Sequence, residues 1–262
     1  MKIVVIGSGS DGNSTYIKGD TANILIDAGI SFRQIKSRLA SVGINDYNFN
    51  ALFITHEHGD HTKYIGSIVK NTGVKYYMAE MSYYNVSSAI FSDVKIYEHG
   101  FVEPFSSITI NDMKISFISL SHDSLECLGL IIEEHGKRIV YVADTGYLDE
   151  DYRDILTGAN CYLFEANHDP AMEMESNRPQ ELKNRVLGDR GHLSNEDSAV
   201  NLSYLITDNT KNIIFLHRSR DCNNLDVLKE TVFRVFDAFS IDYKKIEFDY
   251  AEQNSPTRLI EV

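Results

Sequence analysis

Short apolar runs separated by turn residues recur along most of the chain. Runs of four to eight residues rich in Val, Ile, Phe and Tyr are typical of strands, and turn residues bound them on both sides. The strands predicted from this pattern cover residues 3–6, 14–18, 23–27, 51–55, 75–78, 95–98, 107–110, 113–120, 127–133, 137–143, 161–166, 212–216 and 245–248.

Longer stretches in which apolar positions recur every three or four residues predict helices. These stretches cover residues 31–42, 62–72, 80–90, 195–207 and 223–238. Strands outnumber helices, and helices occur in both halves of the chain. This order suits an α+β protein in which two sheets face each other with helices outside, an αββα four-layer sandwich. No repeat, low-complexity tract or linker interrupts the pattern, so we expect a single domain over residues 1–262.

Composition places the chain among globular proteins and indicates its compartment. Of its 262 residues, 43% are hydrophobic and 24% are charged, which is ordinary for such a protein. No apolar run approaches the roughly 18 residues of a membrane span, and the opening "MKIVVI" is too short for a signal peptide. The three cysteines form no C-x-x-C pair and predict reduced thiols, hence a cytoplasmic protein without a membrane partner.

The glycine-rich stretch "VVIGSGSDGNS" at residues 4–14 has the spacing of a dinucleotide-binding loop. Gly7, Gly9 and Gly12 read G-x-G-x-x-G, and Asp27 follows about 20 residues on, where such proteins bind ribose. That fingerprint requires a helix directly after the glycines. Here "STYIKGDTANILI" follows, which predicts two strands and a turn. The pattern therefore favours a loop between antiparallel strands, with a nucleotide site as the alternative.

The strongest chemical signal is "THEHGDH" at residues 55–61, directly after the strand predicted at 51–55. It places His56, His58, Asp60 and His61 in H-x-H-x-D-H spacing. Imidazole nitrogens and a carboxylate suit Zn²⁺, Mn²⁺ and Fe²⁺ alike. A polar surface turn is the alternative, but the motif favours a metal loop.

The motif resembles that of the metallo-β-lactamase superfamily, in which three further ligands follow later strands. Here "ISFISLSHD", "RIVYVADTG" and "NIIFLHRS" each end an apolar run with a candidate ligand, in the order that the superfamily uses. The resemblance implies two divalent metal ions, zinc or manganese and possibly iron. The ligands it implies are His56, His58 and His122 for one ion, Asp60, His61 and His217 for the other, and Asp144 as a bridge between them.

The same resemblance gives the glycine loop and Asp27 other roles. In the superfamily the first strands form a hairpin, and the acid of "LIDAG" supports the metal loop. Asp27 is then expected to orient a ligand histidine. The glycine loop is expected at the rim of the site, where its backbone N–H groups could meet a phosphate and where Ser10 and Asn13 could contact substrate.

Two further motifs indicate which branch of the superfamily the chain resembles. "FEANHD" and "GHLSNED" are similar to elements of the tRNA-processing RNase Z, which implies that Glu165 orients His192 and that His192 protonates the leaving oxygen. An N-terminal helix cap at Ser194 is an additional reading of the second motif. Residues 5 to about 230 resemble the bacterial YycJ (WalJ) family in their motifs, from "SGSDGNSTYI" to "HRSRDCNN", and in the order of these motifs. That family is cytoplasmic, binds two metals and is linked to 5′→3′ DNA exonuclease activity.

The resemblance therefore predicts a hydrolase, namely a two-metal phosphodiesterase or nuclease that acts as a DNA exonuclease. The expected nucleophile is a hydroxide that bridges the two metals, and Asp60 could accept a proton from the water that forms it. The net charge of −13 argues against a nucleic-acid partner, but this acidic chain also contains a cluster of basic residues. We expect Lys183, Arg185, Arg190 and Ser219 to contact substrate, unless the basic residues form only a solvated helix face. The alternatives are hydrolysis of a small cyclic nucleotide, lactone or thioester, and a metal-binding regulator without catalysis. The sequence leaves the metals, the polarity and the oligomeric state open.

Overall fold

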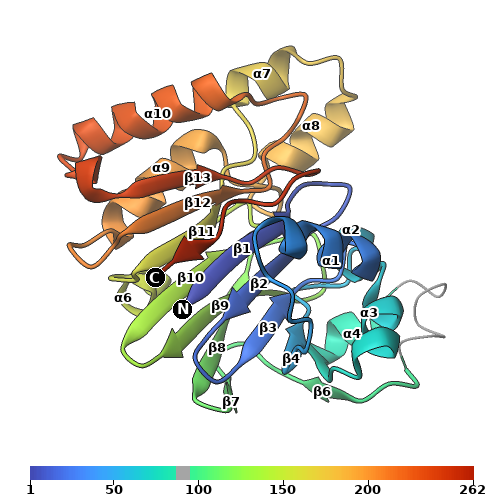
Figure 1. Ribbon diagram of the computed structural model, residues 1–262. Coiled ribbons are helices and arrows are strands. Elements are labelled where there is room, and N and C mark those ends of the chain that lie inside the picture. The colour runs from blue at the N-terminus through green and yellow to red at the C-terminus, as the bar shows by residue number, and fades with distance from the viewer. Residues whose placement is uncertain (87–94) are drawn as a thin grey trace. The chain divides into compact units, whose positions relative to one another are not determined.

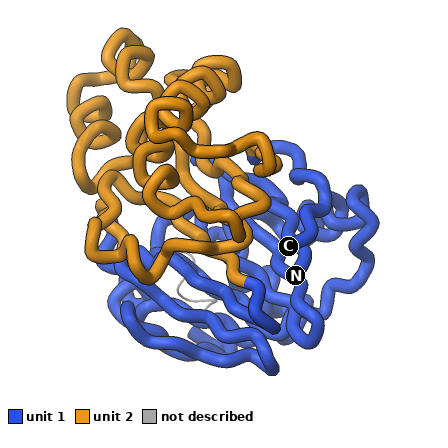
Figure 2. Tube along the Cα trace, turned by 90° about the vertical axis from the view of Figure 1, so that its left-hand side faces the viewer, with its two compact units in different colours: residues 1–119, 124–137, 251–262 blue, residues 120–123, 138–250 orange. Residues whose placement is uncertain are grey.

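The computed structural model describes residues 1–86 and 95–262 of the chain (Figure 1). The chain forms two compact units (Figure 2). Unit 1 comprises residues 1–119, 124–137 and 251–262, and unit 2 comprises residues 120–123 and 138–250. The expectation of a single domain over residues 1–262 stays a prediction. Within the described ranges, no helix is both long and apolar enough to cross a membrane.

Unit 1 contains a seven-stranded sheet in the order β14-β1-β2-β3-β4-β5-β6. β2 pairs antiparallel with β1 and with β3, and this confirms the predicted hairpin after the glycine loop. From β3 onward the strands are parallel. The bounds are β1 (Lys2–Gly7), β2 (Ser14–Lys18), β3 (Asn23–Ile26), β4 (Ala51–Phe53), β5 (Tyr76–Met78), β6 (His99–Phe101) and β14 (Ile260–Glu261).

The helices of unit 1 connect the parallel strands. They are α1 (Phe32–Ser41), α2 (Gly59–Thr62), α3 (Ile65–Thr72) and α4 (Glu80–Asn85). The helix predicted over residues 62–72 is thus preceded by a separate turn of helix, because the Tyr64 N–H donates to the Ala28 carbonyl at the break. The helix predicted over 80–90 ends at Asn85, and residues 87–90 lie outside the described residues. The strand predicted near 95–98 lies slightly later, as β6.

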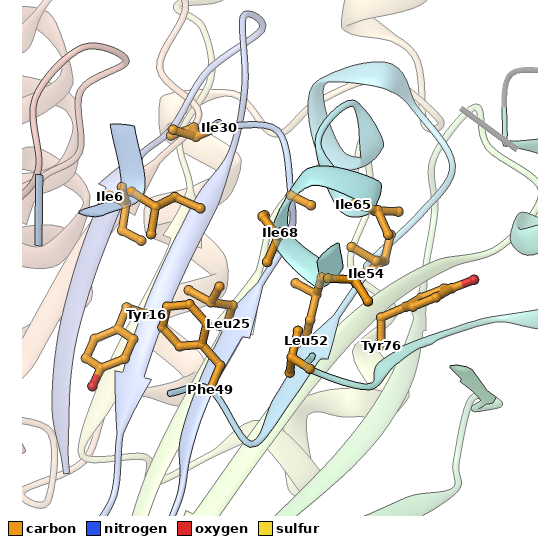
Figure 3. Close-up of a cluster of buried hydrophobic side chains, with 14 of the residues drawn as sticks. Ile6, Tyr16, Leu25, Ile30, Phe49, Leu52, Ile54, Ile65, Ile68 and Tyr76 are labelled. Atoms are coloured by element: carbon orange, nitrogen blue, oxygen red, sulfur yellow. The ribbon is translucent and has the colours of Figure 1, made fainter. Parts of the chain in front are cut away.

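An apolar core packs α1 and α3 against this sheet, and Figure 3 shows the part of it that lies between α3 and the strands. Leu25 and Leu52 point from the sheet, and Ile35 and Ile68 from the two helices. Each such side chain contributes about 1.5–3 kcal/mol when fully removed from water. The core therefore fixes the end of β4, which leads into the candidate ligand loop, and the end of β3, which leads into Asp27.

Unit 1 also contains β7 (Ser107–Ile110), β9 (Cys127–Glu134) and nearly all of β8 (Met113–Leu120), in the order β9-β8-β7. Unit 2 contains a parallel sheet whose neighbouring strands follow the chain order. Its strands are β10 (Lys137–Val142), β11 (Cys161–Glu165), β12 (Asn212–Leu216) and β13 (Glu247–Tyr250).

The helices of unit 2 include several that the apolar pattern did not predict. The two long ones, α9 (Asn195–Leu205) and α10 (Leu225–Ala238), match predicted helices. The short α6 (Arg153–Leu156) and α7 (Pro170–Glu175) were missed because four to six residues are too few to show a helical period. The remaining elements are α8 (Gln180–Leu187) and two turns of 3₁₀ helix, η1 (Glu150–Tyr152) and η2 (Tyr243–Lys245).

Candidate metal centre

The H-x-H-x-D-H motif forms a compact group of donors in unit 1. β4 ends just before it, and the short helix α2 turns the chain so that residues 56, 58, 60 and 61 approach one another. The His56 ring centroid lies 4.6 Å from that of His58 and 4.1 Å from that of His61. Asp60 Oδ2 lies 3.3 Å from His61 Nε2. Three imidazoles and one carboxylate are thus gathered by six residues of chain, 56–61.

Asp27 lies beneath this loop and orients His61. Its fully buried carboxylate lies 2.8 Å from His61 Nδ1, and it accepts hydrogen bonds from the Thr55 N–H at 2.9 Å and the Thr55 hydroxyl at 3.0 Å. Because Nδ1–H is committed to Asp27, Nε2 is the nitrogen that remains to bind a metal. The sequence reasoning missed Thr55, although it stands directly before the first histidine of the motif.

The glycine loop is expected at the rim of the site. The N–H groups of Ser8, Gly9, Asp11, Gly12 and Asn13 all donate to acceptors within unit 1. These five N–H groups are already bonded, whereas the expectation that the loop meets a phosphate stays a prediction. Ser10 is exposed, whereas Asn13 is buried, with its side-chain nitrogen 3.2 Å from Asp60 Oδ2.

A second group of donors lies in unit 2, at the carboxyl ends of its parallel strands. Glu165 is the last residue of β11, His217 directly follows β12, and Asp144 follows β10 by two residues. One ligand atom each of Asp144, Glu165, His192 and His217 lies within 4.8 Å of the others. The carboxyl ends of parallel strands are a common place for ligand sites in such sheets.

Glu165 is shared by two of these histidines. Its Oε1 accepts a hydrogen bond from His192 Nδ1 at 2.7 Å and lies 3.3 Å from His217 Nδ1, while Oε2 accepts from the Thr145 N–H at 2.8 Å. Burial alone would raise the pKa of Glu165, but the adjoining His192 and His217 hold the pKa below its ordinary value. The carboxylate therefore stays ionised and acts as an acceptor for both rings.

His122 is held in the tautomer that leaves Nε2 for a metal. Its Nδ1–H donates to the Gly191 carbonyl at 3.1 Å. Burial lowers the pKa of His122, with His192 acting in the same direction and Asp144 against it. The neutral imidazole that results is the form that binds metal ions.

Asp27, Asp144 and His217 have left-handed backbone conformations, with φ of 64°, 57° and 53°. For residues other than glycine this costs about 1–3 kcal/mol each and is concentrated at functional sites. Asn167 fixes one of these residues, His217. The sequence reasoning missed Asn167, although the motif "FEANHD" contains it. Its amide donates to the His217 carbonyl at 2.7 Å and lies 3.2 Å from His217 Nδ1.

The remaining expected substrate contacts are bonded within unit 2. Lys183 is buried and donates to the Met174 carbonyl at 2.6 Å, which corrects the expectation that it grips a phosphate. Arg185 pairs with Asp123 but stays half exposed, and Arg190 Nε donates to the His122 carbonyl at 2.9 Å. Ser219 accepts from the Arg178 guanidinium at 3.3 Å.

The donors of both units fit divalent transition metals. Imidazole nitrogens and ionised carboxylate oxygens are the ligands that zinc, manganese and iron share. Unit 1 offers His61, which Asp27 orients, and unit 2 offers His217, which lies against Glu165, and His122, which a backbone carbonyl orients. These three rings thus have the supporting contact that metal-binding histidines usually have.

Comparison with known proteins identifies the family. The model of the β-lactamase superfamily domain matches residues 22–217, which is most of the chain. The chain belongs to this superfamily. An exodeoxyribonuclease YycJ from Bacillus anthracis is 30% identical over 246 residues, covering 90% of this chain and 92% of the relative. Superfamily membership and this relative together identify the chain as a metal-dependent hydrolase.

Comparison with solved structures identifies the fold of this chain. The metallo-β-lactamase fold protein YhfI from Bacillus subtilis matches with a TM-score of 0.70 and 15% identity, over 97% of this chain and 98% of that one. Zn²⁺-bound PqqB from Methylobacterium extorquens matches with a TM-score of 0.71 and 15% identity, over 100% of both chains. The predicted αββα sandwich is therefore confirmed as the fold class.

Asp27→Asn tests the support beneath the metal loop. The amide can still contact Thr55 but no longer carries the charge that orients and polarises His61. We expect metal affinity to fall about 10- to 100-fold, as is usual when such a partner is removed. Competition with a chelator of known affinity measures this. Asp112→Asn, at an exposed position of unit 1, serves as the control and should leave the affinity unchanged.

Proposed function

We propose that this chain is a two-metal exonuclease that degrades DNA from the 5′ end. The Glu165–His192 pair beside Asp144 and His217 is the observation that carries the proposal. It supplies a proton donor next to candidate metal ligands, as phosphodiester hydrolysis requires. The name of the YycJ relative supports DNA as the substrate, and the Zn²⁺-bound PqqB supports a divalent metal.

The metal ligands follow from the order of motifs in the superfamily. We assign His56, His58 and His122 to one ion and Asp60, His61 and His217 to the other, with Asp144 bridging. When bound, the ions supply Lewis-acid chemistry by lowering the pKa of a water and polarising a phosphoryl oxygen. Zinc and manganese are the metals we propose, and the cytoplasm the compartment.

His192 is the proposed proton donor to the leaving 3′-oxygen. Its Nδ1–H is held by Glu165, so Nε2 is the atom that can deliver a proton to substrate. The side chain is 15% exposed, which keeps it accessible at the edge of the donor cluster. Asp60, 22% exposed, is the carboxylate that can take a proton from the attacking water in addition to its role as a ligand.

Arg185 and Arg190 are the proposed contacts to flanking phosphates, with Ser10 and Ser219 as further polar contacts. Binding of DNA should weaken with salt because counterions are released around neutralised phosphates. Arg185→Ala should reduce the slope of log affinity against log salt by about one. Arg234→Ala is the matched control, since Arg234 is also exposed and paired with an acid, Glu196. A flat salt dependence of the unmodified protein would favour a small substrate instead.

The substrate class is tested with three substrates in parallel. Metal-loaded protein is incubated with DNA labelled at either end, the same sequence as RNA, and bis-p-nitrophenyl phosphate. We expect DNA to be degraded faster than RNA, with early release of the 5′ label. Preference for RNA, or hydrolysis of the nitrophenyl diester with intact DNA, would contradict the proposal.

A further inference from the structure

The glycine loop has the spacing of a nucleotide-binding motif, but it contacts the candidate metal loop at residues 55–61. The Asn13 N–H donates to the Asp60 carbonyl at 2.8 Å, and the Gly29 N–H donates to the Asn13 carbonyl at 2.9 Å. Two glycines permit this approach. A Cβ on Gly29 would lie 1.7 Å from the Asp60 carbonyl oxygen, and one on Gly12 would lie 2.1 Å from the Gly29 oxygen. The loop is thus packed directly on the backbone of a candidate ligand.

The Asn13 side chain is locked in one orientation. Its Oδ1 accepts the Gly9 N–H at 2.8 Å and the Ser8 hydroxyl at 3.2 Å, so the oxygen must face the glycine loop. The amide nitrogen therefore contacts both the Gly9 carbonyl and the candidate metal loop. It lies 3.1 Å from the Gly9 carbonyl, 3.2 Å from Asp60 Oδ2 and 3.0 Å from His61 Nε2.

We propose that Asn13 is a positioning residue that orients Asp60 for the metal that Asp60 and His61 hold. The amide has two hydrogens, of which one serves the Gly9 carbonyl and the other lies between Asp60 and His61. A metal at His61 Nε2 takes the lone pair of that nitrogen, so the second hydrogen goes to Asp60 Oδ2. The carboxylate of Asp60 is then fixed in rotation. This inference rests on the proposed ligand assignment.

Asn13 touches ligands of one proposed ion only, and this makes the inference specific. Asn13→Ala should weaken binding of one ion at least tenfold and leave the other unchanged. A residue that only stabilised the fold would weaken both. Turnover should fall through kcat rather than KM, because Asp60 is oriented without a change in substrate contacts.

The measurement is stepwise zinc binding to purified apoprotein by chelator competition, followed by metal content after gel filtration. Asn71→Ala is the matched control, since Asn71 is an exposed asparagine of the same unit whose amide bonds the Ser67 carbonyl, and it should retain both affinities. Asn13→Ser, which keeps a small polar group in the loop, should repeat the one-ion pattern if the alanine variant does not fold.

The outcomes separate the two proposals. Unmodified protein with two ions and an alanine variant with one would support the role of Asn13. Two ions with unchanged affinities in both Asn13 variants, or equal weakening of both ions, would overturn it alone. Fewer than two ions in the unmodified protein would instead overturn the ligand assignment on which it rests.

Discussion

Asp144→Ala should remove both metal ions and reduce hydrolysis of every substrate to background. The assignment makes Asp144 the one carboxylate that binds both ions, and its side chain is buried after β10. Substitution of any other single ligand should remove mainly one of the two ions. Metal content measured after purification without chelator, with close to two ions per chain in the unmodified protein, gives the comparison.

Asp154→Ala is the control for this variant, because Asp154 is an exposed aspartate of the same unit. It should retain both ions and full activity. Thermal unfolding of the apoproteins shows whether the Asp144 variant is folded before its metal content is judged. Full occupancy in folded Asp144→Ala would rule out the bridging role.

His192→Ala should keep both ions and yet cut DNA hydrolysis by about 10²–10⁴-fold, the usual contribution of a general acid. The leaving 3′-oxygen of DNA is a poor leaving group and needs a proton. A nitrophenolate needs little protonation, so the same variant should lose much less activity on bis-p-nitrophenyl phosphate. Rates on the two substrates, measured at equal metal loading, test the role.

His135→Ala, at an exposed histidine of unit 1, should change neither rate. An equal loss on both substrates would show that His192 does not donate the proton. Loss of metal instead would make it a ligand. Glu165→Gln should affect both metal content and turnover, because Glu165 contacts His217 as well as His192.

Sequence alone was sufficient to place the candidate donors at strand ends. Asp144, Glu165 and His217 each close an apolar run, and parallel strands bring the ends of such runs to one edge of a sheet. The hairpin of β2 and β3 was also predictable, because the turn residues between them leave no room for a crossover helix.

The role of the glycine loop could not be predicted from its spelling. Two of its N–H groups bond acceptors far away in sequence: Asp11 donates to Gln253, and Ser8 donates to the Glu252 carbonyl. Local pattern contains no information about such partners. Lys183 is a similar case, since local pattern does not indicate the Met174 carbonyl that binds its ammonium group.

Release of 5′-terminal nucleotides from labelled DNA, with and without metal, tests the central claim most directly. Protein stripped by chelator should release no label, and zinc or manganese should restore release of the 5′-terminal nucleotide before any 3′ label appears. His192→Ala at full metal loading should remain slow. DNA left intact by fully loaded protein that still hydrolyses bis-p-nitrophenyl phosphate, or release that survives removal of the metal, would contradict the account.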